Sequence, residues 1–228
     1  MLNRSIKSFL KAIPGVVPAH FAIVQTGRAL TSRRATISRR RFSDKLAKQI
    51  AAAADQIKIN LGAGLTSYEH WISVEFTELD ASNGKDWERY FVPDSISNVL
   101  AEHVWEHMTD AQGLEAARLV NKYLKKSGCF RVAVPDRNHP SPDYYDDCKP
   151  DPFILGHKVF YDRDQLVDLL QSAGFTQVTP VEWWDAAGHF NERPWDDGRG
   201  HVNRSAHHDP LNVGGSLTYT SLIVDAVK

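Results

Sequence analysis

Segments typical of strands alternate with segments typical of helices over residues 43–228, and this alternation restricts the chain to few folds. Strands that are joined through helices run parallel, because only a long crossover returns the chain to the same end of the sheet. The sequence therefore predicts an α/β fold: a doubly wound, mostly parallel sheet with helices on both faces. The last two strands, close to the C-terminus, are expected to form an antiparallel edge. The expected strands lie at residues 57–61, 71–76, 96–101, 129–134, 178–183 and 217–227.

Capping residues mark the beginnings of three expected helices. Ser43 can cap a helix that includes the run Ala51 to Ala54, which has high helix propensity. The segments Thr109 to Gln112 and Asp162 to Gln165 both have the capping-box pattern, in which the first and fourth residues bond to each other's backbone. Two further helices are therefore expected to begin there.

The charge of the chain is unevenly distributed. The net charge is −1, but residues 1–50 carry eleven Lys and Arg against one acid, for +10, and the remainder carries −11. We expect a basic N-terminal extension over residues 1–42, followed by a domain over residues 43–228. The extension could lie as a solvated arm on its own acidic domain, rest on anionic lipid, or serve as an Arg- and Ser-rich transit peptide. Nucleic acid is a disfavoured partner, because the domain offers no second basic surface.

Cysteine usage and hydropathy favour a cytoplasmic protein. Cys129 and Cys148 lack C-x-x-C spacing and are too few for a disulfide framework, which favours a reducing compartment. No stretch approaches the ~20 apolar residues that a membrane helix needs. Peripheral contact of the basic N-terminus with an anionic membrane and import into an organelle remain as alternatives, and the oligomeric state is open.

A glycine-rich turn follows the first expected strand. Ligands of doubly wound sheets bind beyond the carboxyl ends of the strands, where Gly62-Ala63-Gly64 allows close approach of the backbone. Glu75 ends the second strand and suits the two hydroxyls of a ribose. A dinucleotide fold would have a third glycine where Ser67 stands and an acid ~20 residues after the turn. NAD is therefore disfavoured.

Several motifs follow one another from about residue 56 to the C-terminus. They are Lys-Ile-Asn-Leu-Gly-Ala-Gly (58–64), Trp-Ile-Ser-Val-Glu (71–75), Leu-Asp-Ala (79–81), Ala-Glu-His-Val-Trp-Glu-His (101–107), residues 124–136, Gly-His-Lys (156–158) and residues 219–227. In this order the motifs resemble those of the class I S-adenosylmethionine-dependent methyltransferases and, more narrowly, of a subgroup of predicted methyltransferases with a short first loop. The resemblance implies a Rossmann-like methyltransferase fold, with S-adenosylmethionine as the cofactor.

The resemblance also implies how the cofactor is held. The residues that would line its site are Leu61, Gly62 and Gly64 at the amino acid part, Glu75 at the ribose, Asp80 and Ala81 at the adenine, and Glu102 and His103 on the methyl-donor side. The family usually has aspartate at the position of Glu75. Residues 65–70 are too few for the usual first helix, so loop amides or Tyr68 would replace its N-terminus near the cofactor carboxylate.

Methyl transfer is an in-line displacement, so the protein must align the reactants and accept a proton where the nucleophile carries one. The candidate catalytic bases are His103, His107 and Asp136, with His139 as a further candidate, and Glu106 could orient either neighbouring histidine. The expected acceptor is a hydroxyl or carboxyl of a small molecule or glycan. This interpretation includes no metal.

Two other functions stay open. His103, Glu106 and His107 spell H-x-x-E-H, a pattern found in zinc hydrolases, with His139, His157 or Glu182 as a third ligand. The chain could also be a non-catalytic module that binds the cofactor. The polar residues 188–212 are expected to form a lid or substrate site, with Trp183, Trp184 and Trp195 as apolar surfaces, or a solvated loop.

Overall fold

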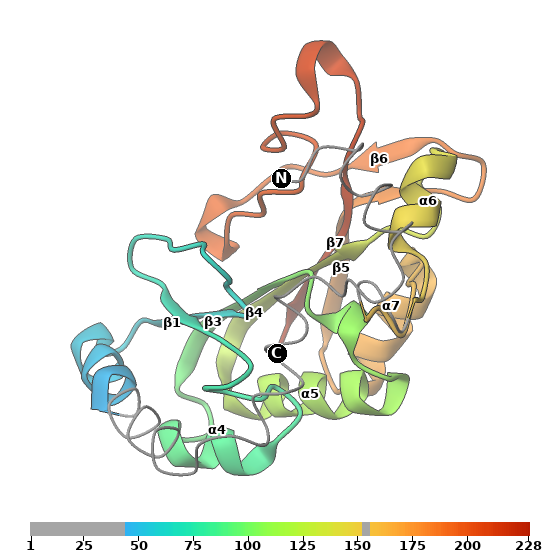
Figure 1. Cartoon of the computed structure of the whole chain (residues 1–228). Helices are drawn as coiled ribbons and strands as arrows, with labels where there is room; N and C mark the ends of the chain where they lie inside the picture. The colour runs from blue at the N-terminus through green and yellow to red at the C-terminus, as the bar shows by residue number, and fades with distance from the viewer. Residues whose placement is uncertain (1–43, 152–155) are drawn as a thin grey trace, which may run out of the picture. The chain divides into compact units, whose positions relative to one another are not determined.

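A computed structural model describes residues 44–151 and 156–228 (Figure 1). The basic extension expected over residues 1–42, and the expected cap at Ser43, lie outside these residues. Residues 44–53 are helical, where the alanine-rich helix was expected. In the part of the chain that is described, no helix has the length and apolar character needed to cross a membrane.

The strands are β1 (Ile57–Leu61), β2 (Ile72–Val74), β3 (Ile96–Glu102), β4 (Leu124–Pro135), β5 (Gln177–Trp184), β6 (Phe190–Glu192) and β7 (Ser221–Val227). The labelled α-helices are α4 (Gly84–Tyr90), α5 (Asp110–Tyr123), α6 (Pro142–Cys148) and α7 (Arg163–Ser172), and the 3₁₀ turns are η1 (Trp105–His107), η2 (Asp197–Arg199) and η3 (Val213–Gly215). The two predicted capping boxes are both formed, at the beginnings of α5 and α7.

The strands form a single sheet in the order β2-β1-β3-β4-β7-β5-β6. Neighbours from β2 to β4 are parallel, whereas β7 is antiparallel to both β4 and β5, and β6 is antiparallel to β5. The predicted fold class, a mostly parallel Rossmann-like sheet with an antiparallel C-terminal edge region, is confirmed. Within that region β7 lies between β4 and β5, so the short β6 forms the outer edge. Strand β7 begins at Ser221, whereas the sequence predicted a strand that begins at Leu217.

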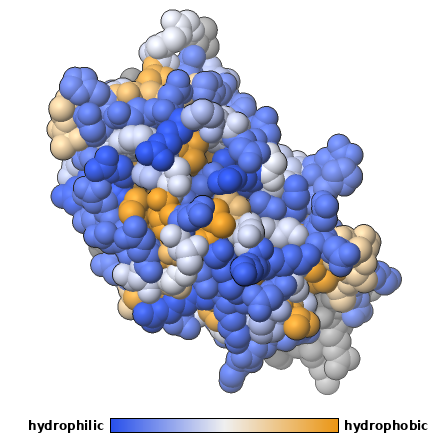
Figure 2. Space-filling view, turned by 180° about the vertical axis from the view of Figure 1, so that it is seen from behind, coloured by the Kyte–Doolittle hydropathy of each residue, from blue (hydrophilic) through white to orange (hydrophobic). Residues whose placement is uncertain are grey.

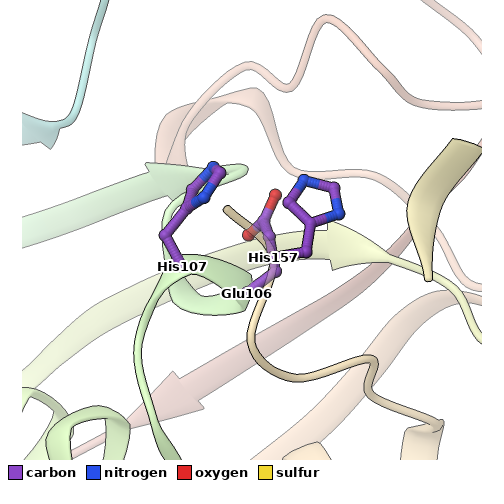
Figure 3. A group of neighbouring side chains, drawn as sticks. All are labelled: Glu106, His107 and His157. Carbon is purple, nitrogen blue, oxygen red and sulfur yellow. The ribbon is translucent and has the colours of Figure 1, made fainter. Parts of the chain in front are cut away.

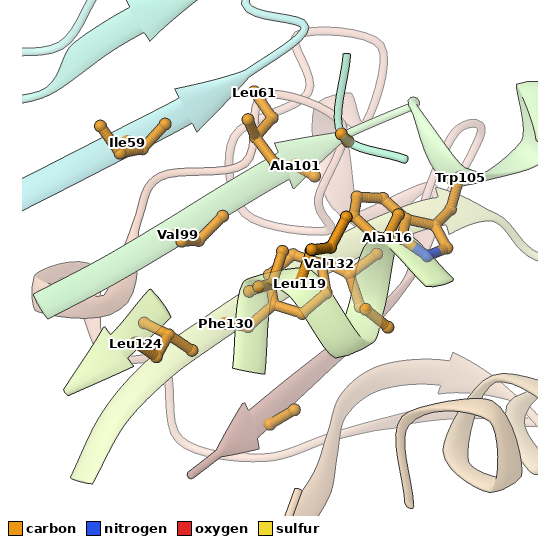
Figure 4. Packing of buried hydrophobic residues seen from close by; sticks show 14 of the residues in the cluster. Ile59, Leu61, Val99, Ala101, Trp105, Ala116, Leu119, Leu124, Phe130 and Val132 are labelled. Carbon is orange, nitrogen blue, oxygen red and sulfur yellow. The ribbon is translucent and has the colours of Figure 1, made fainter. Parts of the chain in front are cut away.

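The main core lies between one face of the sheet and helices α4, α5 and α7 (Figures 1 and 4). Alternate residues of the central strands point to this face, as the period of two requires. In β3, for example, Val99 and Ala101 contribute to this core, whereas Leu100 points to the opposite face. Val99 and Ala101 therefore lie on the face that α4, α5 and α7 cover.

The opposite face of the sheet is covered differently from what the sequence predicted. Its apolar residues Leu100, Ala133, Val181 and Ile223 form a second buried cluster with Val202, packed by Tyr68, Trp71 and Trp195. We expected helices on both faces, but only residues 62–71 join β1 to β2, and they contain no helix. The irregular segment 193–209 takes the place of a helical layer.

A buried arginine anchors this segment, here called the cover segment (residues 193–209). The Arg131 side chain is fully buried and makes two hydrogen bonds to Asp225, from Nε at 2.7 Å and from Nη2 at 2.9 Å. Arg131 Nη1 also donates to the carbonyls of Asp196 (2.9 Å) and Gly200 (2.6 Å), and the Trp195 ring lies 4.5 Å from the guanidinium carbon. One cation thus ties the sheet to both ends of η2.

Two carboxylates hold the rest of the cover segment. Glu102 accepts hydrogen bonds from the backbone N–H groups of Asn203 (3.1 Å) and Arg204 (2.8 Å), and Glu182 accepts one from Ala206 (2.8 Å). Burial raises the pKa of Glu182 to about 7. The cover segment is therefore pinned to strands β3, β4 and β5 through side-chain contacts.

The surface carries few large apolar side chains. Leu65, Phe76, Val92, Tyr145 and Leu211 are the exposed ones among the described residues. The face drawn in Figure 2 is mostly hydrophilic, with apolar residues in small separate patches. Two of the five, Leu65 and Phe76, lie next to Gly64 and Glu75 in the chain, at the end of the sheet where a ligand was expected.

We expect Arg131→Met to lower the free energy of unfolding by about 3–5 kcal/mol, because it leaves Asp225 buried without its main partner. The measurement is urea denaturation, with Arg163→Met as the control. Arg163 pairs with Asp164 on the surface at 2.8 Å, and loss of an exposed pair costs less than about 1 kcal/mol. Equal effects of the two substitutions would contradict the anchoring role of Arg131.

Glu182→Gln is expected to become increasingly stabilising, relative to the unsubstituted chain, as the pH rises from 5 to 8. The folded chain favours the neutral carboxyl, so the contribution of Glu182 to stability is present below pH 4.5 and is lost as the pH rises through about 7. The difference in the free energy of unfolding between Glu182→Gln and the unsubstituted chain changes by about 3 kcal/mol at most, since each pKa unit corresponds to about 1.36 kcal/mol. Melting curves at several pH values measure it, with the exposed Glu115→Gln as control. A pH-independent difference would contradict the assignment.

Candidate functional site

The topology of the sheet locates the candidate site. The order of the strands reverses at β1, because β2 lies on one side of it and β3 on the other. In open α/β sheets, ligands bind in the crevice beyond the carboxyl ends of the strands at such a switch point. Leu61 is in register with Val74 and with Ala101. The next residue of each strand, Gly62, Glu75 and Glu102, therefore lies at the same edge.

The turn after β1 depends on its glycines. Gly62 and Gly64 have φ values of +62° and +60°, in the left-handed region that favours glycine. A Cβ atom on Gly62 would lie 2.6 Å from Cγ2 of Val104, whereas a Cβ atom on Gly64 would meet nothing within 4 Å. Gly62 is thus required by packing, and Gly64 leaves open space beside the backbone.

Glu75 closes this turn from the neighbouring strand. The Gly64 N–H donates a hydrogen bond to Oε1 of Glu75, and the Glu75 N–H donates to Oε2 of Glu78 at 2.9 Å. The Glu75 side chain is partly exposed. Leu65 and Phe76, which follow Gly64 and Glu75, are 107% and 58% exposed. A carboxylate and two uncovered apolar side chains therefore surround the glycine turn.

Asp80 and Ala81 form a turn before α4. The Asp80 carboxylate accepts hydrogen bonds from the backbone and hydroxyl of Ser82, at 3.0 and 2.8 Å. Ala81 is buried, and its carbonyl accepts a hydrogen bond from the indole of Trp87 at 2.9 Å. Both residues are rigidly held, and Asp80 is partly exposed.

Glu102 and His103 follow β3 but differ in what they contact. The Glu102 carboxylate accepts hydrogen bonds from the cover segment, at Asn203 and Arg204. The hydroxyl of Tyr68 accepts a further hydrogen bond from the Asn203 side chain, at 3.0 Å. Burial and the nearby Glu102 charge raise the pKa of Tyr68 to about 12, so the phenol stays neutral. Glu102 therefore positions the cover segment at the edge of the site.

His103 lies between two partners. Its Nε2 is 3.0 Å from the Ser221 hydroxyl and its Nδ1 is 3.1 Å from Oε1 of Glu106. The backbone of His103 has a positive φ of 56°. Burial alone would raise the pKa of Glu106, but the His103 and His107 imidazoles lower it below its usual value. Ser221, the first residue of β7, was not predicted as a site residue. Only the tertiary position of β7 places it here.

The metal-binding pattern H-x-x-E-H is not assembled as the sequence suggested. Among the described residues, His103 does not join Glu106 and His107 in a group with metal-ligand spacing; His157 does, from the segment before α7 (Figure 3). The spacing rule assumes a helix, but η1 is a single 3₁₀ turn of three residues. A second group in the cover segment comprises Asp197, His201 and His208.

Asp136 is buried, unlike the candidate bases His103 and His107. It is 0% exposed, and its two oxygens accept hydrogen bonds from the backbone of Asn138 (2.9 Å) and Trp184 (2.7 Å). Burial raises the pKa of Asp136 to about 6 and lowers the pKa of the buried His139 to about 4. This carboxylate joins β4 to the end of β5, and its role as a catalytic base stays a prediction. Its position just past a strand end could not reveal that burial.

The region expected to form a lid or substrate site is largely the cover segment. A pocket of about 560 Å³ lies in it, lined by Glu192, Arg193, Pro194, Trp195, Asp197, His207 and His208. Trp184 is not a free surface, because it is buried and its indole donates to Thr220 at 2.8 Å. Trp183 and Trp195 are partly exposed, each beside an arginine.

Comparison of the sequence with protein-family models and with curated proteins finds no match. Among solved structures, the chain is similar to an S-adenosylmethionine-dependent methyltransferase of Thermotoga maritima, described as a possible histamine N-methyltransferase. The identity is 14%, over 91% of this chain and 97% of that one, with a TM-score of 0.48. The chain is also similar to an S-adenosylmethionine-dependent methyltransferase of Archaeoglobus fulgidus. The identity is 14%, over 83% of this chain and 94% of that one, with a TM-score of 0.45.

A third solved structure is a putative methyltransferase of Haloferax volcanii, in complex with a methyltransferase activator. It has 13% identity over 86% of this chain and 94% of that one, and a TM-score of 0.44.

Proposed function

We propose that residues 43–228 form a methyltransferase domain that transfers the methyl group of S-adenosylmethionine to a hydroxyl or carboxyl of a small-molecule or glycan acceptor. The observation that carries the proposal is the aligned edge of three parallel strands. There a glycine turn, Glu75 and Glu102 follow Leu61, Val74 and Ala101, which are in register. This edge is where a ligand of such a sheet binds.

The residues at this edge suit the cofactor. The open space beside Gly64 admits a ligand close to the backbone, and the partly exposed Glu75 carboxylate offers acceptors for ribose hydroxyls. Leu65 and Phe76 supply uncovered apolar surface of the kind on which a base packs. Leu61, Gly62, Asp80 and Ala81 shape the surrounding turns, and we assign all of these residues to the cofactor site.

When bound, the cofactor supplies the electrophilic methyl group; the chain's own part is to align the acceptor and exclude water. His103 follows Glu102 on the expected donor side, and Glu106 orients its imidazole. We assign His103 as the group that takes the acceptor's proton, with the more exposed His107 as the alternative. The pocket in the cover segment, with the partly exposed Trp195, is the proposed acceptor site.

The first test is binding of S-adenosylhomocysteine, measured by calorimetry. We expect a micromolar dissociation constant, and no detectable binding to Gly64→Val, which fills the open space, or to Glu75→Ala, which removes the hydroxyl acceptor. Gly188→Val is the matched control, because Gly188 also has a positive φ (79°) but lies between β5 and β6. Glu88→Ala, on the exposed face of α4, is the control for Glu75.

Absence of heat with either cofactor form at millimolar concentration would reject the proposal. Equal loss of binding in Gly188→Val would show that backbone strain, rather than contact with the ligand, explains the effect at Gly64. Release of S-adenosylhomocysteine from S-adenosylmethionine, with fractionated cell extract as the acceptor source, separates an enzyme from a non-catalytic module.

A further inference from the structure

The residues Glu106, His107 and His157 converge although they come from two separate parts of the chain. Each offers one ligand atom, and these atoms all lie within 4.8 Å of one another. Figure 3 shows the Glu106 carboxylate between the two imidazole rings, whose centroids are 5.0 Å apart. A carboxylate and two imidazoles at this spacing can share one cation.

The backbone fixes this arrangement. The N–H groups of Lys158 and Val159 donate hydrogen bonds to the Glu106 carbonyl, at 2.7 and 3.3 Å. The residues that follow His157 are thereby held against η1, which carries Glu106 and His107. The convergence is part of the folded chain and does not depend on flexible side chains alone.

The Glu106 carboxylate is buried and lacks a full set of partners. It is 1% exposed, and its Oε2 atom accepts no hydrogen bond from any residue that the structure describes. Its Oε1 atom has the His103 ring nitrogen at 3.1 Å. Because a buried charge is costly unless it is paired, an oxygen left open toward two imidazoles points to a missing positive partner.

His157 is oriented as a metal ligand would be. Its Nδ1 lies 2.8 Å from the carbonyl oxygen of Cys148. Because a carbonyl can only accept, Nδ1 must carry the hydrogen, which leaves a lone pair on Nε2. Histidine ligands commonly donate their second N–H to a carbonyl in this way. His157 is 7% exposed, whereas His107 is exposed and gives an ion access from solvent.

We propose that Glu106, His107 and His157 form a binding site for one divalent transition-metal ion, with Zn²⁺ as the expected occupant. Two nitrogen ligands and one carboxylate oxygen suit Zn²⁺ better than the harder Mg²⁺ or Ca²⁺, which prefer oxygen ligands. Three protein ligands leave at least one position open for water or another ligand. The proposal does not depend on cofactor binding, since no residue assigned to the cofactor site takes part. Glu106 and His107 would be shared with the proposed proton transfer, so the metal is tested by binding rather than by activity.

The other group, Asp197, His201 and His208, is a weaker candidate and serves as the comparison. Asp197 is exposed, and its carboxylate accepts a hydrogen bond from the Trp195 indole at 2.6 Å. The Nδ1 atom of His208 lies 2.9 Å from the Ser205 hydroxyl. One polar atom of Asp197 and one of His208 thus have partners, and among the described residues this group contains no buried polar atom without a partner.

The test is calorimetric titration of the full chain, stripped with a chelator and dialysed, with ZnCl₂. We expect one equivalent to bind. Loss of a residue that only supports a metal ligand weakens metal binding by about 10–100-fold. His107→Gln and His157→Gln each remove a ligand and should weaken Zn²⁺ binding by more than that. His107 is exposed, so its substitution tests the site even if changes at buried residues disturb folding. The double variant His201→Gln/His208→Gln is the control and should bind as the unsubstituted chain does.

Co²⁺ gives an independent readout. Co²⁺ added to the stripped chain should give a visible absorption spectrum. The spectrum should be absent when Co²⁺ is added to His107→Gln and present when it is added to the His201/His208 control. Two results would overturn the proposal: no binding of Zn²⁺ at millimolar concentration, or binding that the His201/His208 variant abolishes and His107→Gln leaves unchanged. Calorimetry with S-adenosylhomocysteine on the His107→Gln variant shows whether loss of metal binding is accompanied by loss of cofactor binding. The metal site and the proposed function can therefore fail separately.

Discussion

The buried ion pair between Arg131 and Asp225 is the interaction on which the second face of the sheet depends. Both residues lie in central strands, and a charge at either position alone would be unfavourable without the other. Because the guanidinium also binds the carbonyls of Asp196 and Gly200, the pair extends into the cover segment. An irregular segment can thus cover a sheet face that helices usually cover.

The candidate site follows from this arrangement. Once η2 is fixed on the sheet, the chain continues to Asn203 and Arg204, which bond to Glu102 at the carboxyl end of β3. Tyr68, from the loop after β1, meets the same asparagine. The cover segment and the first loop therefore meet beside the glycine turn.

The sequence supported local features well and non-local ones poorly. The capping boxes at Thr109 and Asp162, and the turn at Gly62, depend on residues within a few positions of one another, so their patterns were sufficient. The strand expected at residues 129–134 is present and contains Arg131, but nothing nearby identified Asp225 as its partner. Likewise, the place of Asp136 after a strand did not reveal that its carboxylate is buried and bonded to the backbone of Trp184. Contacts between distant segments determine burial, and one sequence does not specify them.

His103 connects the two proposed sites. Its Nδ1 faces the Glu106 carboxylate, which also lies beside His107 and His157, and its Nε2 faces Ser221 at the beginning of β7. A cation held by Glu106 would draw that carboxylate toward the metal and weaken its contact with His103. The imidazole would then be held mainly by Ser221. The orientation of the one histidine on the expected donor side is thereby linked to whether a metal occupies the neighbouring group. The short turn η1 carries both Glu106 and His107, so a shift at either residue reaches the other directly.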